Sequence, residues 1–420
     1  MRRAPALRTP GSRKEIKMPD KKTIARIADE GAAKYKDEAF EELVKLASID
    51  SGHGDPVGSA NMVNALEEIM MKDLKGLKFE KIVKEGFGTH ILATLNEGNP
   101  NGRIIISGHT DTVFKQGDCA KFPVHIDEKD PDIAWGLGIT DCKGGLVVAV
   151  KAVKVAMENG LLPDKEICFA FECDEEGGGG GGNELLHSRV IPEDPSKTLC
   201  FVFESSRDED GVLIARKGSC GITIDVEGIR SHSGINYKAG RSAMFELAFQ
   251  LLELLKYNDD ERGIQFNVGR VVNDDPANVV SGHATAAISV RIANSADLDR
   301  VKEIVDLMNK GPKYYVDGTK VKVTLDRVSV PMEEDEKNKS LYEYVRDCGR
   351  LHGDELVVQR TGGSGTASWY SYHGIPTVDA LGTYQIQIHT HDERMRISSI
   401  EKKISLFATV LGCLKEDRDI

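Results

Sequence analysis

The fold is decided by residues 103–111, which read Arg-Ile-Ile-Ile-Ser-Gly-His-Thr-Asp. The run of isoleucines predicts a short strand. His109 and Asp111 leave the end of this strand two residues apart, so they face the same side. One of them can bind a metal while the other orients it, because a metal-bound imidazole usually donates its second N–H to a carboxylate. Taken alone, a His-x-Asp pair is more often a structural feature, so the neighbouring segments decide between the two interpretations.

The segments around this strand alternate between helices and strands. Before it, helical apolar spacing covers residues 23–48 and 58–74, and a β-rich run covers residues 88–95. After it, a helical stripe leads to compact apolar runs at residues 166–172 and 199–204, which are typical of buried strands. This alternation predicts an α/β fold with a mostly parallel central sheet flanked by helices.

A different pattern occupies residues 217–330. Its predicted elements are a strand at 221–228, a helix at 241–257, strands at 264–272 and 284–292, a helix at 296–308 and a strand at 320–326. The order β-α-β-β-α-β is the ferredoxin-like motif. After Pro331 the α/β pattern resumes, with a strand at 377–381 and a closing helix from Ser398. We therefore expect one discontinuous domain, residues 23–216 and 331–420, with a second domain inserted at 217–330.

The composition agrees with two ordered domains. The chain has 420 residues, of which 40% are hydrophobic and 29% charged, and this length is too great for one ordinary core. The net charge is −12, although eight basic and two acidic residues lie among the first 22, so the rest of the chain carries −18. A nucleic-acid-binding protein is therefore not expected.

Targeting signals and disulfides are not expected either. No uncharged apolar run approaches the roughly 18 residues of a membrane helix. The basic leader, residues 1–22, lacks the hydrophobic region of a secretory signal and is predicted to be a disordered tail; an Arg-rich organelle presequence is the alternative. Eight cysteines without a Cys-x-x-Cys pair indicate reduced thiols, and small buried side chains are their expected role. These features predict a soluble, cytoplasmic protein.

The next chemical motif is Gly136-Leu-Gly-Ile-Thr-Asp141, followed by Cys-Lys-Gly-Gly. It resembles a dinucleotide-binding fingerprint, but Asp141 occupies the position of the third glycine, where an acid would repel a pyrophosphate. Asp141 is therefore better explained as a carboxylate metal ligand. A nucleotide-binding oxidoreductase is correspondingly disfavoured. A serine hydrolase is not indicated, because the chain lacks Gly-x-Ser-x-Gly.

Further acids and histidines follow other predicted strands. Asp174-Glu175-Glu176 and six glycines come after one apolar run, Glu204 ends the next, and His389-Thr-His391 comes late in the chain. Carboxyl ends of parallel strands are where α/β sheets place their sites. Two histidines and three carboxylates can hold two divalent ions, and nitrogen and oxygen ligands suit zinc, with cobalt or manganese as substitutes. The other histidines have no such context.

Taken together, these ordered motifs resemble the di-zinc metallopeptidase and deacylase family of glutamate carboxypeptidase, acetylornithine deacetylase, succinyl-diaminopimelate desuccinylase and aminoacylase. The resemblance covers residues 25–415 and is closest to the bacterial glutamate carboxypeptidase branch. It implies that Asp141 bridges two metals. One metal would also be bound by His109 and Glu204, and the other by Glu176 and His389. The His-x-x-x-Glu spacing to Glu393 favours His389 over His391 as the last ligand.

The resemblance also implies catalytic and substrate-binding roles. Asp111 would orient His109, and Glu175 would be the general base. The link between Asp141 and Cys142 would be a cis peptide. The inserted domain would serve as lid and dimerisation platform, from which His232 would reach the partner's site and stabilise an oxyanion. Residues expected to contact substrate are Asn278, Arg291, Gly362 and Gly363. Thr366 stands where the family commonly has an acid, which leaves the preferred substrate open.

The sequence thus predicts a dimeric zinc-dependent hydrolase that cleaves a small peptide or amide next to a free α-carboxylate. Removal of an acyl group from an N-acyl amino acid is the alternative within enzymes, since the same metal centre serves both reactions. The alternative from another class is a catalytically silent metal-binding relative. The presence of Glu175 beside Glu176 argues against it, because metal binding alone needs no second acid there.

Overall fold

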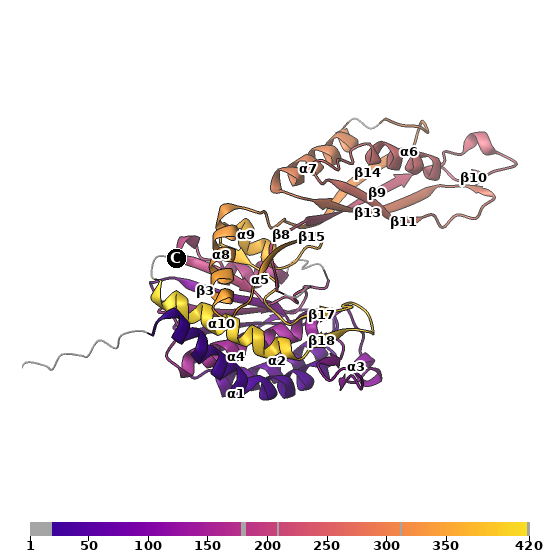
Figure 1. Cartoon of the computed structure of the whole chain (residues 1–420). Coiled ribbons are helices and arrows are strands. Elements are labelled where there is room, and N and C mark those ends of the chain that lie inside the picture. The colour runs from indigo at the N-terminus through magenta and orange to yellow at the C-terminus, as the bar shows by residue number, and fades with distance from the viewer. Residues whose placement is uncertain (1–18, 178–181, 208–209, 311–312, 418–420) are drawn as a thin grey trace, which may run out of the picture.

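The computed structural model describes residues 19–177, 182–207, 210–310 and 313–417 (Figure 1). Residues 1–18 of the predicted leader and four of the six glycines lie outside these ranges. Helix α1 (Lys21–Ala47) begins two residues inside the predicted leader, because the Asp20 side chain accepts a hydrogen bond from Thr23 N and caps the helix.

The central sheet is built around the strand that contains the three isoleucines. Its six strands are, in spatial order, β1 (Lys78–Lys84), β2 (Gly88–Leu95), β6 (Glu166–Glu172), β3 (Arg103–His109), β7 (Thr198–Val202) and β16 (Thr377–Val378). Strands β6, β3, β7 and β16 are parallel, and the β1–β2 hairpin adds antiparallel strands at one edge. The mostly parallel sheet is therefore as predicted.

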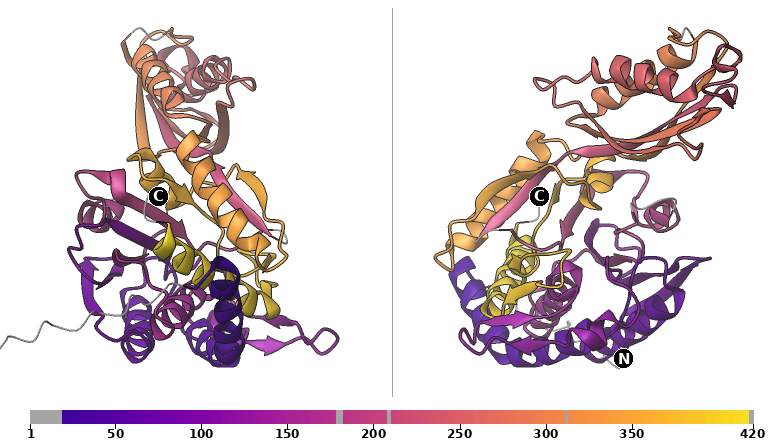
Figure 2. Two further views of the ribbon diagram at one scale, coloured as in Figure 1. Left: turned by 60° about the vertical axis from the view of Figure 1, so that its left-hand side comes forward. Right: turned by 90° about the vertical axis from the view of Figure 1, so that its right-hand side faces the viewer.

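Both faces of this sheet are covered. Ile104 and Ile106 join the core beneath helices α1, α4 (Gly145–Glu158) and α10 (Ser398–Glu416), whereas Ile105 joins the smaller core on the opposite face. Helix α2 (Pro56–Asp73) extends the first layer, and α5 (Gly182–Val190) and α9 (Ala367–Tyr372) lie on the second (Figure 2). An apolar strand without alternation is stable only between two such layers.

The inserted segment has the predicted order of strands and helices. Its elements are β9 (Gly218–Glu227), α6 (Ala243–Leu255), β11 (Gln265–Val272), β13 (His283–Ile292), α7 (Ser295–Lys310) and β14 (Lys320–Ser329). The four strands pair antiparallel in the order β11-β13-β9-β14, and both helices cover one face (Figure 1). Strand β9 alternates buried and half-buried side chains because only that face is covered. The division into domains at residues 217 and 330 remains a prediction.

The remaining elements are short strands and helices together with α8 (Glu336–Arg350), whose Leu341, Tyr342 and Val345 belong to the larger core. The short elements are α3 (Asp118–Lys121), β4 (His125–Ile126), β5 (Ile133–Trp135), β8 (Gly211–Arg216), β10 (Ser231–His232), β12 (Val279–Val280), β15 (Val357–Thr361), β17 (Gln385–Ile386) and β18 (Arg394–Arg396). The strand predicted at 377–381 stops after Val378, because Ala380 takes a left-handed φ of 67° that turns the chain. No helix of the described residues is long and apolar enough to cross a membrane. All eight cysteines are buried thiols.

Candidate metal centre

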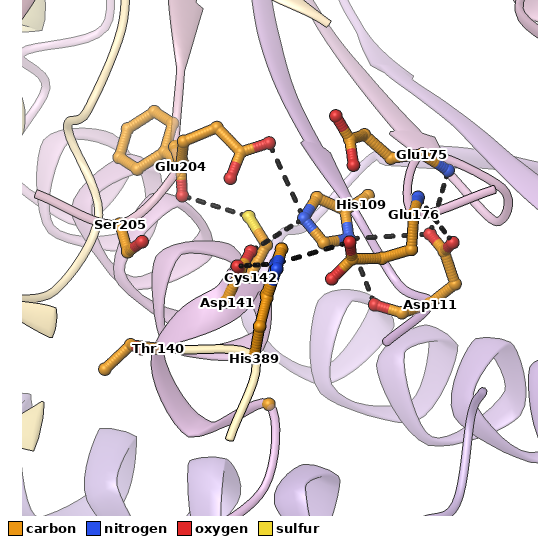
Figure 3. A network of polar contacts seen from close by, with 12 residues as sticks. His109, Asp111, Thr140, Asp141, Cys142, Glu175, Glu176, Glu204, Ser205 and His389 are labelled. Carbon is orange, nitrogen blue, oxygen red and sulfur yellow. Dashed lines mark hydrogen bonds and ion pairs between the residues drawn. The ribbon is translucent and has the colours of Figure 1, made fainter. Parts of the chain in front are cut away.

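The predicted metal ligands meet at the carboxyl end of the central sheet (Figure 3). His109 is the last residue of β3, and its Nε2 lies 3.0 Å from Oδ1 of Asp141 and 3.5 Å from Oε1 of Glu204. Asp141 lies in the turn that enters α4, and Glu204 follows β7. Parallel strands bring residues that are far apart in sequence to one edge, so these three motifs converge there.

A second histidine approaches Asp141 from the other side. His389 Nε2 lies 3.1 Å from Asp141 Oδ2 and 3.4 Å from Glu176 Oε2. Hydrogen bonds with these two carboxylates raise the pKa of His389 to about 10. Burial acts to raise the pKa of Asp141, but its bonds to both histidines lower it. Asp141 thus presents one oxygen to each half of the cluster, the arrangement that a bridging ligand requires.

Asp111 has more contacts than the resemblance implies. His109 Nδ1 lies 3.0 Å from the backbone carbonyl of Asp111 and 3.4 Å from its carboxylate. The carboxylate instead accepts the backbone N–H groups of Glu175 at 3.1 Å and Glu176 at 3.0 Å. Asp111 therefore orients the imidazole mainly through its carbonyl, while its carboxylate holds the loop that carries two further acids.

Glu175 differs from the other acids of the cluster. Glu176 and Glu204 form ion pairs with histidine, but Glu175 forms none with any described residue. Burial raises the pKa of Glu175 well above its ordinary value, and the neighbouring carboxylates of Glu204 and Glu176 add to this effect. Its carboxyl group is thus free to exchange a proton, as a general base must be.

Glu393 holds the turn that carries Asp141. Its carboxylate accepts hydrogen bonds from Gly138 N at 2.9 Å, from N and Oγ1 of Thr140 at 3.0 Å each, and from Asp141 N at 3.2 Å. The sequence indicated Glu393 only through its spacing from His389, so this role was missed. The peptide bond from Asp141 to Cys142 is cis, as the resemblance implies.

Cys142 and His391 are two further potential metal ligands near the cluster, but the side chain of each contacts another residue. Cys142 is close enough to His109 and Glu204 to share a metal, yet its thiol donates to Phe203 O at 3.1 Å and burial raises its pKa well above the ordinary value. His391 stacks on Phe122 with ring centroids 4.3 Å apart. His389, and not His391, therefore faces the cluster.

The other groups of potential ligands are already compensated by lysines. Asp174, beside His90 and Cys173, binds Lys84 Nζ at 2.7 Å. The acids of the remaining group bind lysine ammonium groups; they are Glu38, Glu42 and Asp73, with Lys72, Lys151 and Lys154 as partners. Neither group needs a metal ion for charge balance.

The predicted substrate-binding residues lie outside the cluster in this chain. His232, on β10, and Asn278, directly before β12, belong to a small ribbon at the far end of the inserted unit (Figure 1). Arg291 lies on β13, in register with Gln265 and Ser219 of the neighbouring strands. Gly362 and Gly363 follow β15, where Gly363 N donates to Thr361 Oγ1. None of these residues contacts the cluster within the described part of the chain.

A buried ion pair near the cluster had no signal in the sequence. Arg216 Nε, at the end of β8, donates to Asp379 Oδ2 at 2.6 Å; the Asp379 side chain is fully buried and that of Arg216 is 10% exposed. Burial acts to lower the pKa of Arg216, but the negative charges of Asp379 and Glu204 raise it above its ordinary range. The guanidinium also lies against Gly365, on the turn that contains Gly362 and Gly363.

The donor set fits two divalent cations. Five carboxylates gather around two imidazoles, so negative charge would exceed positive charge even with both histidines protonated; they are Asp111, Asp141, Glu175, Glu176 and Glu204. Such crowding is costly unless cations compensate it. The residues that would hold them offer only imidazole nitrogen and carboxylate oxygen, which suits zinc.

Comparison with known proteins identifies a peptidase family. The model of peptidase family M20/M25/M40 matches residues 105–412. Carboxypeptidase G2 of Pseudomonas sp. strain RS-16 is 26% identical over 378 residues, covering 88% of this chain and 87% of that protein. Succinyl-diaminopimelate desuccinylase of Maricaulis maris is 24% identical over 75% of this chain and 82% of that enzyme.

A solved structure shares the fold. The YXEP protein of Bacillus subtilis, described as a dinuclear metal-binding peptidase of family M20, superimposes with a TM-score of 0.64 at 13% identity, over 91% of this chain and 99% of that one. The predicted α/β fold class is thereby confirmed.

Proposed function

Because this chain belongs to peptidase family M20/M25/M40 and is a metallohydrolase acting on peptide or amide bonds, we propose that it is an exopeptidase of the glutamate carboxypeptidase type. It would hydrolyse the amide bond next to a free α-carboxylate. The observation that carries the proposal is the position of Glu175, a half-buried carboxyl without a histidine partner beside a cluster in which Asp141 lies between two histidines.

Each residue of the cluster has a defined task in this proposal. His109, Glu204, Glu176 and His389 would hold two zinc ions, with Asp141 between them. Zinc bound there would supply Lewis acidity and lower the pKa of a water towards about 7. Glu175 would take the proton from the attacking water and pass it to the leaving amine. Asp111 keeps Glu175 within reach by binding its backbone N–H.

The inserted unit would act as lid and dimerisation domain. His232 lies at its far end, so the proposal requires a second copy of the chain to bring His232 to the site as oxyanion stabiliser. The exposed side chains of Phe245 and Leu252 on α6 support such a contact, being 55% and 65% exposed. Asn278 and Arg291 would approach the substrate, the guanidinium binding its carboxylate. Gly362 and Gly363 would line the pocket.

The general base is tested by Glu175→Ala. We expect kcat to fall by at least about 10²-fold while both zinc ions remain bound, because general-base catalysis contributes typically 10²- to 10⁴-fold. Activity that survives in a zinc-loaded variant would refute the role of Glu175.

Sedimentation of the wild type and of Phe245→Glu tests the dimer, and a monomeric wild type would rule it out.

A substrate panel separates this proposal from deacylation. The 24% identity with a succinyl-diaminopimelate desuccinylase supports removal of an acyl group as the second candidate. Short peptides with a free carboxyl terminus are compared with N-acetyl and N-succinyl amino acids at equal concentration. Faster turnover of the peptides supports the exopeptidase, faster turnover of the acyl compounds supports the deacylase, and no turnover of either supports a silent metal-binding relative.

The proposed place of action is the cytoplasm. Eight buried cysteines, none of which forms a disulfide, support a reducing compartment. A fusion of the whole chain to a fluorescent protein locates it directly.

A further inference from the structure

His53 lies beside the metal centre, although its sequence context indicated no role. Its backbone N–H donates to Thr112 O at 2.8 Å, which ties residue 53 to the segment that follows Asp111. The imidazole Nδ1 lies 3.9 Å from Asp111 Oδ2, and the ring lies 5.9 Å from the ring of Phe87. The side chain is 34% exposed, so it is not a core residue.

The imidazole occupies the space beside Gly177, the residue directly after Glu176. A Cβ atom added at Gly177 would lie 1.8 Å from Cε1 of His53, and the three nearest atoms all belong to that imidazole. The backbone of Gly177 does not take a left-handed φ, so it is the close approach of the ring, and not backbone conformation, that opposes a side chain here; a Cβ at 177 would require the imidazole to move. On the lid strand β14, Arg327 Nη1 donates to Gly177 O at 3.4 Å.

The segment of residues 175–177 is therefore contacted from two sides. The Asp111 carboxylate binds the N–H groups of Glu175 and Glu176, while His53 packs against Gly177. A displacement of Gly177 would move the adjacent Glu176 and, with it, Glu175. Because errors of about 1 Å in the position of a reacting group can cost roughly 10²-fold in rate, this packing bears on catalysis.

We propose that His53 is a positioning residue that sets Glu175 and Glu176 through its contact with Gly177. It touches neither the metal ligands nor, in this proposal, the substrate. The effect on turnover rests on the function proposed above, whereas the effect on Glu176 as a ligand is measurable without any substrate.

The test is a set of four proteins: wild type, His53→Ala, Gly177→Ala and the double variant. Alanine at 177 collides with the imidazole, so we expect kcat of Gly177→Ala to fall about 10²-fold with KM changed less than about threefold. Removal of the imidazole makes room for the new methyl group, so the double variant regains at least about tenfold in kcat. Two matched controls are expected to retain activity. His283→Ala removes an exposed histidine of the lid, and Gly269→Ala adds a Cβ that meets nothing closer than 3.8 Å.

Zinc affinity of the same proteins gives an answer that does not depend on activity. Residues that support metal ligands typically change metal affinity 10- to 100-fold when altered. We expect both His53→Ala and Gly177→Ala to weaken zinc binding, Gly177→Ala by about tenfold, and the double variant to regain only the affinity of His53→Ala, because it has neither the collision nor the positioning contact. Equal zinc affinity and equal kcat in wild type and His53→Ala would overturn the proposal, and so would a double variant no better than Gly177→Ala. If no substrate is turned over, the zinc titration alone decides.

Discussion

Lys403 is a buried amine without an acidic partner, and its replacement by methionine should stabilise the protein. It is 2% exposed within α10, and its Nζ donates only to Ala380 O at 3.4 Å. The ammonium also lies 5.1 Å from the centre of the Tyr384 ring. Among the described residues it forms no ion pair. Burial lowers its pKa to about 8 because the charged form is deprived of water.

The size of the effect follows from this pKa. A change from 10.5 to about 8 corresponds to roughly 3 kcal/mol, at about 1.4 kcal/mol for each tenfold change in proton binding. Methionine removes this cost but also removes the bond to Ala380 O, worth about 1 kcal/mol. We therefore expect Lys403→Met to raise the free energy of unfolding by roughly 2 kcal/mol at pH 7.

The pH dependence identifies the cause. Between pH 8 and 10.5 the unfolded chain binds a proton that the folded chain lacks, so the stability of the wild type rises with pH in this window. The advantage of Lys403→Met should therefore shrink by roughly 2 kcal/mol between pH 7 and pH 9.5. Urea unfolding of both proteins, followed by circular dichroism, measures the difference.

The neighbouring lysine is the matched control. Lys402 binds Asp210 at 2.6 Å and Asp354 at 3.1 Å, and these acids raise its pKa against the effect of burial. Lys402→Met should therefore destabilise the protein at pH 7. A Lys403→Met variant that is less stable than the wild type at pH 7, or whose advantage is the same at both pH values, would refute the reasoning.

Two further variants examine buried charges around the metal centre. Arg216→Met leaves the buried carboxylate of Asp379 without its partner at 2.6 Å, so it should lower the free energy of unfolding by about 3 to 5 kcal/mol in urea titrations; an unchanged midpoint would contradict this. Glu393→Gln replaces an anion that accepts four hydrogen bonds from the Asp141 turn, so zinc affinity should fall by roughly 10- to 100-fold in a competition titration with a chelator, whereas unaltered affinity would exclude the positioning role.

The strands of the central sheet could be predicted from the sequence because they depend on local patterns, and the residues expected to bind metal were identified from their places beside such patterns. Apolar runs identify strands buried on two faces, and His109, Glu176 and Glu204 each lie at or shortly beyond such a strand, whereas Asp141 lies in the turn that enters α4. Parallel strand order then brings them to one edge. The βαββαβ unit could equally be predicted from the sequence, because apolar and polar residues alternate along its half-buried strands and its helices are amphipathic.

The missed features depend on contacts between distant loops. Glu393 binds residues 138–141, and His53 packs on Gly177. In each of these contacts, the sequence around one residue gives no sign of the other. Arg216 and Asp379 look like ordinary strand-end charges until the fold buries them together. The strand predicted at 377–381 was too long because nothing in the local pattern announces the left-handed conformation of Ala380.

The glycines of the metal-binding motifs control how closely these loops approach. A Cβ at Gly145, after the Asp141 turn, would lie 1.8 Å from Phe203 O, the carbonyl just before Glu204, and the Cys142 thiol donates to the same carbonyl. The Asp141 turn and the Glu204 strand end are therefore in backbone contact, which sets the spacing of the two carboxylates beside His109. Gly145 thus acts by close approach and not by flexibility. The same reasoning applies to Gly177, so two glycines, one beside each half of the cluster, permit the close approach of the segments that carry the expected metal ligands.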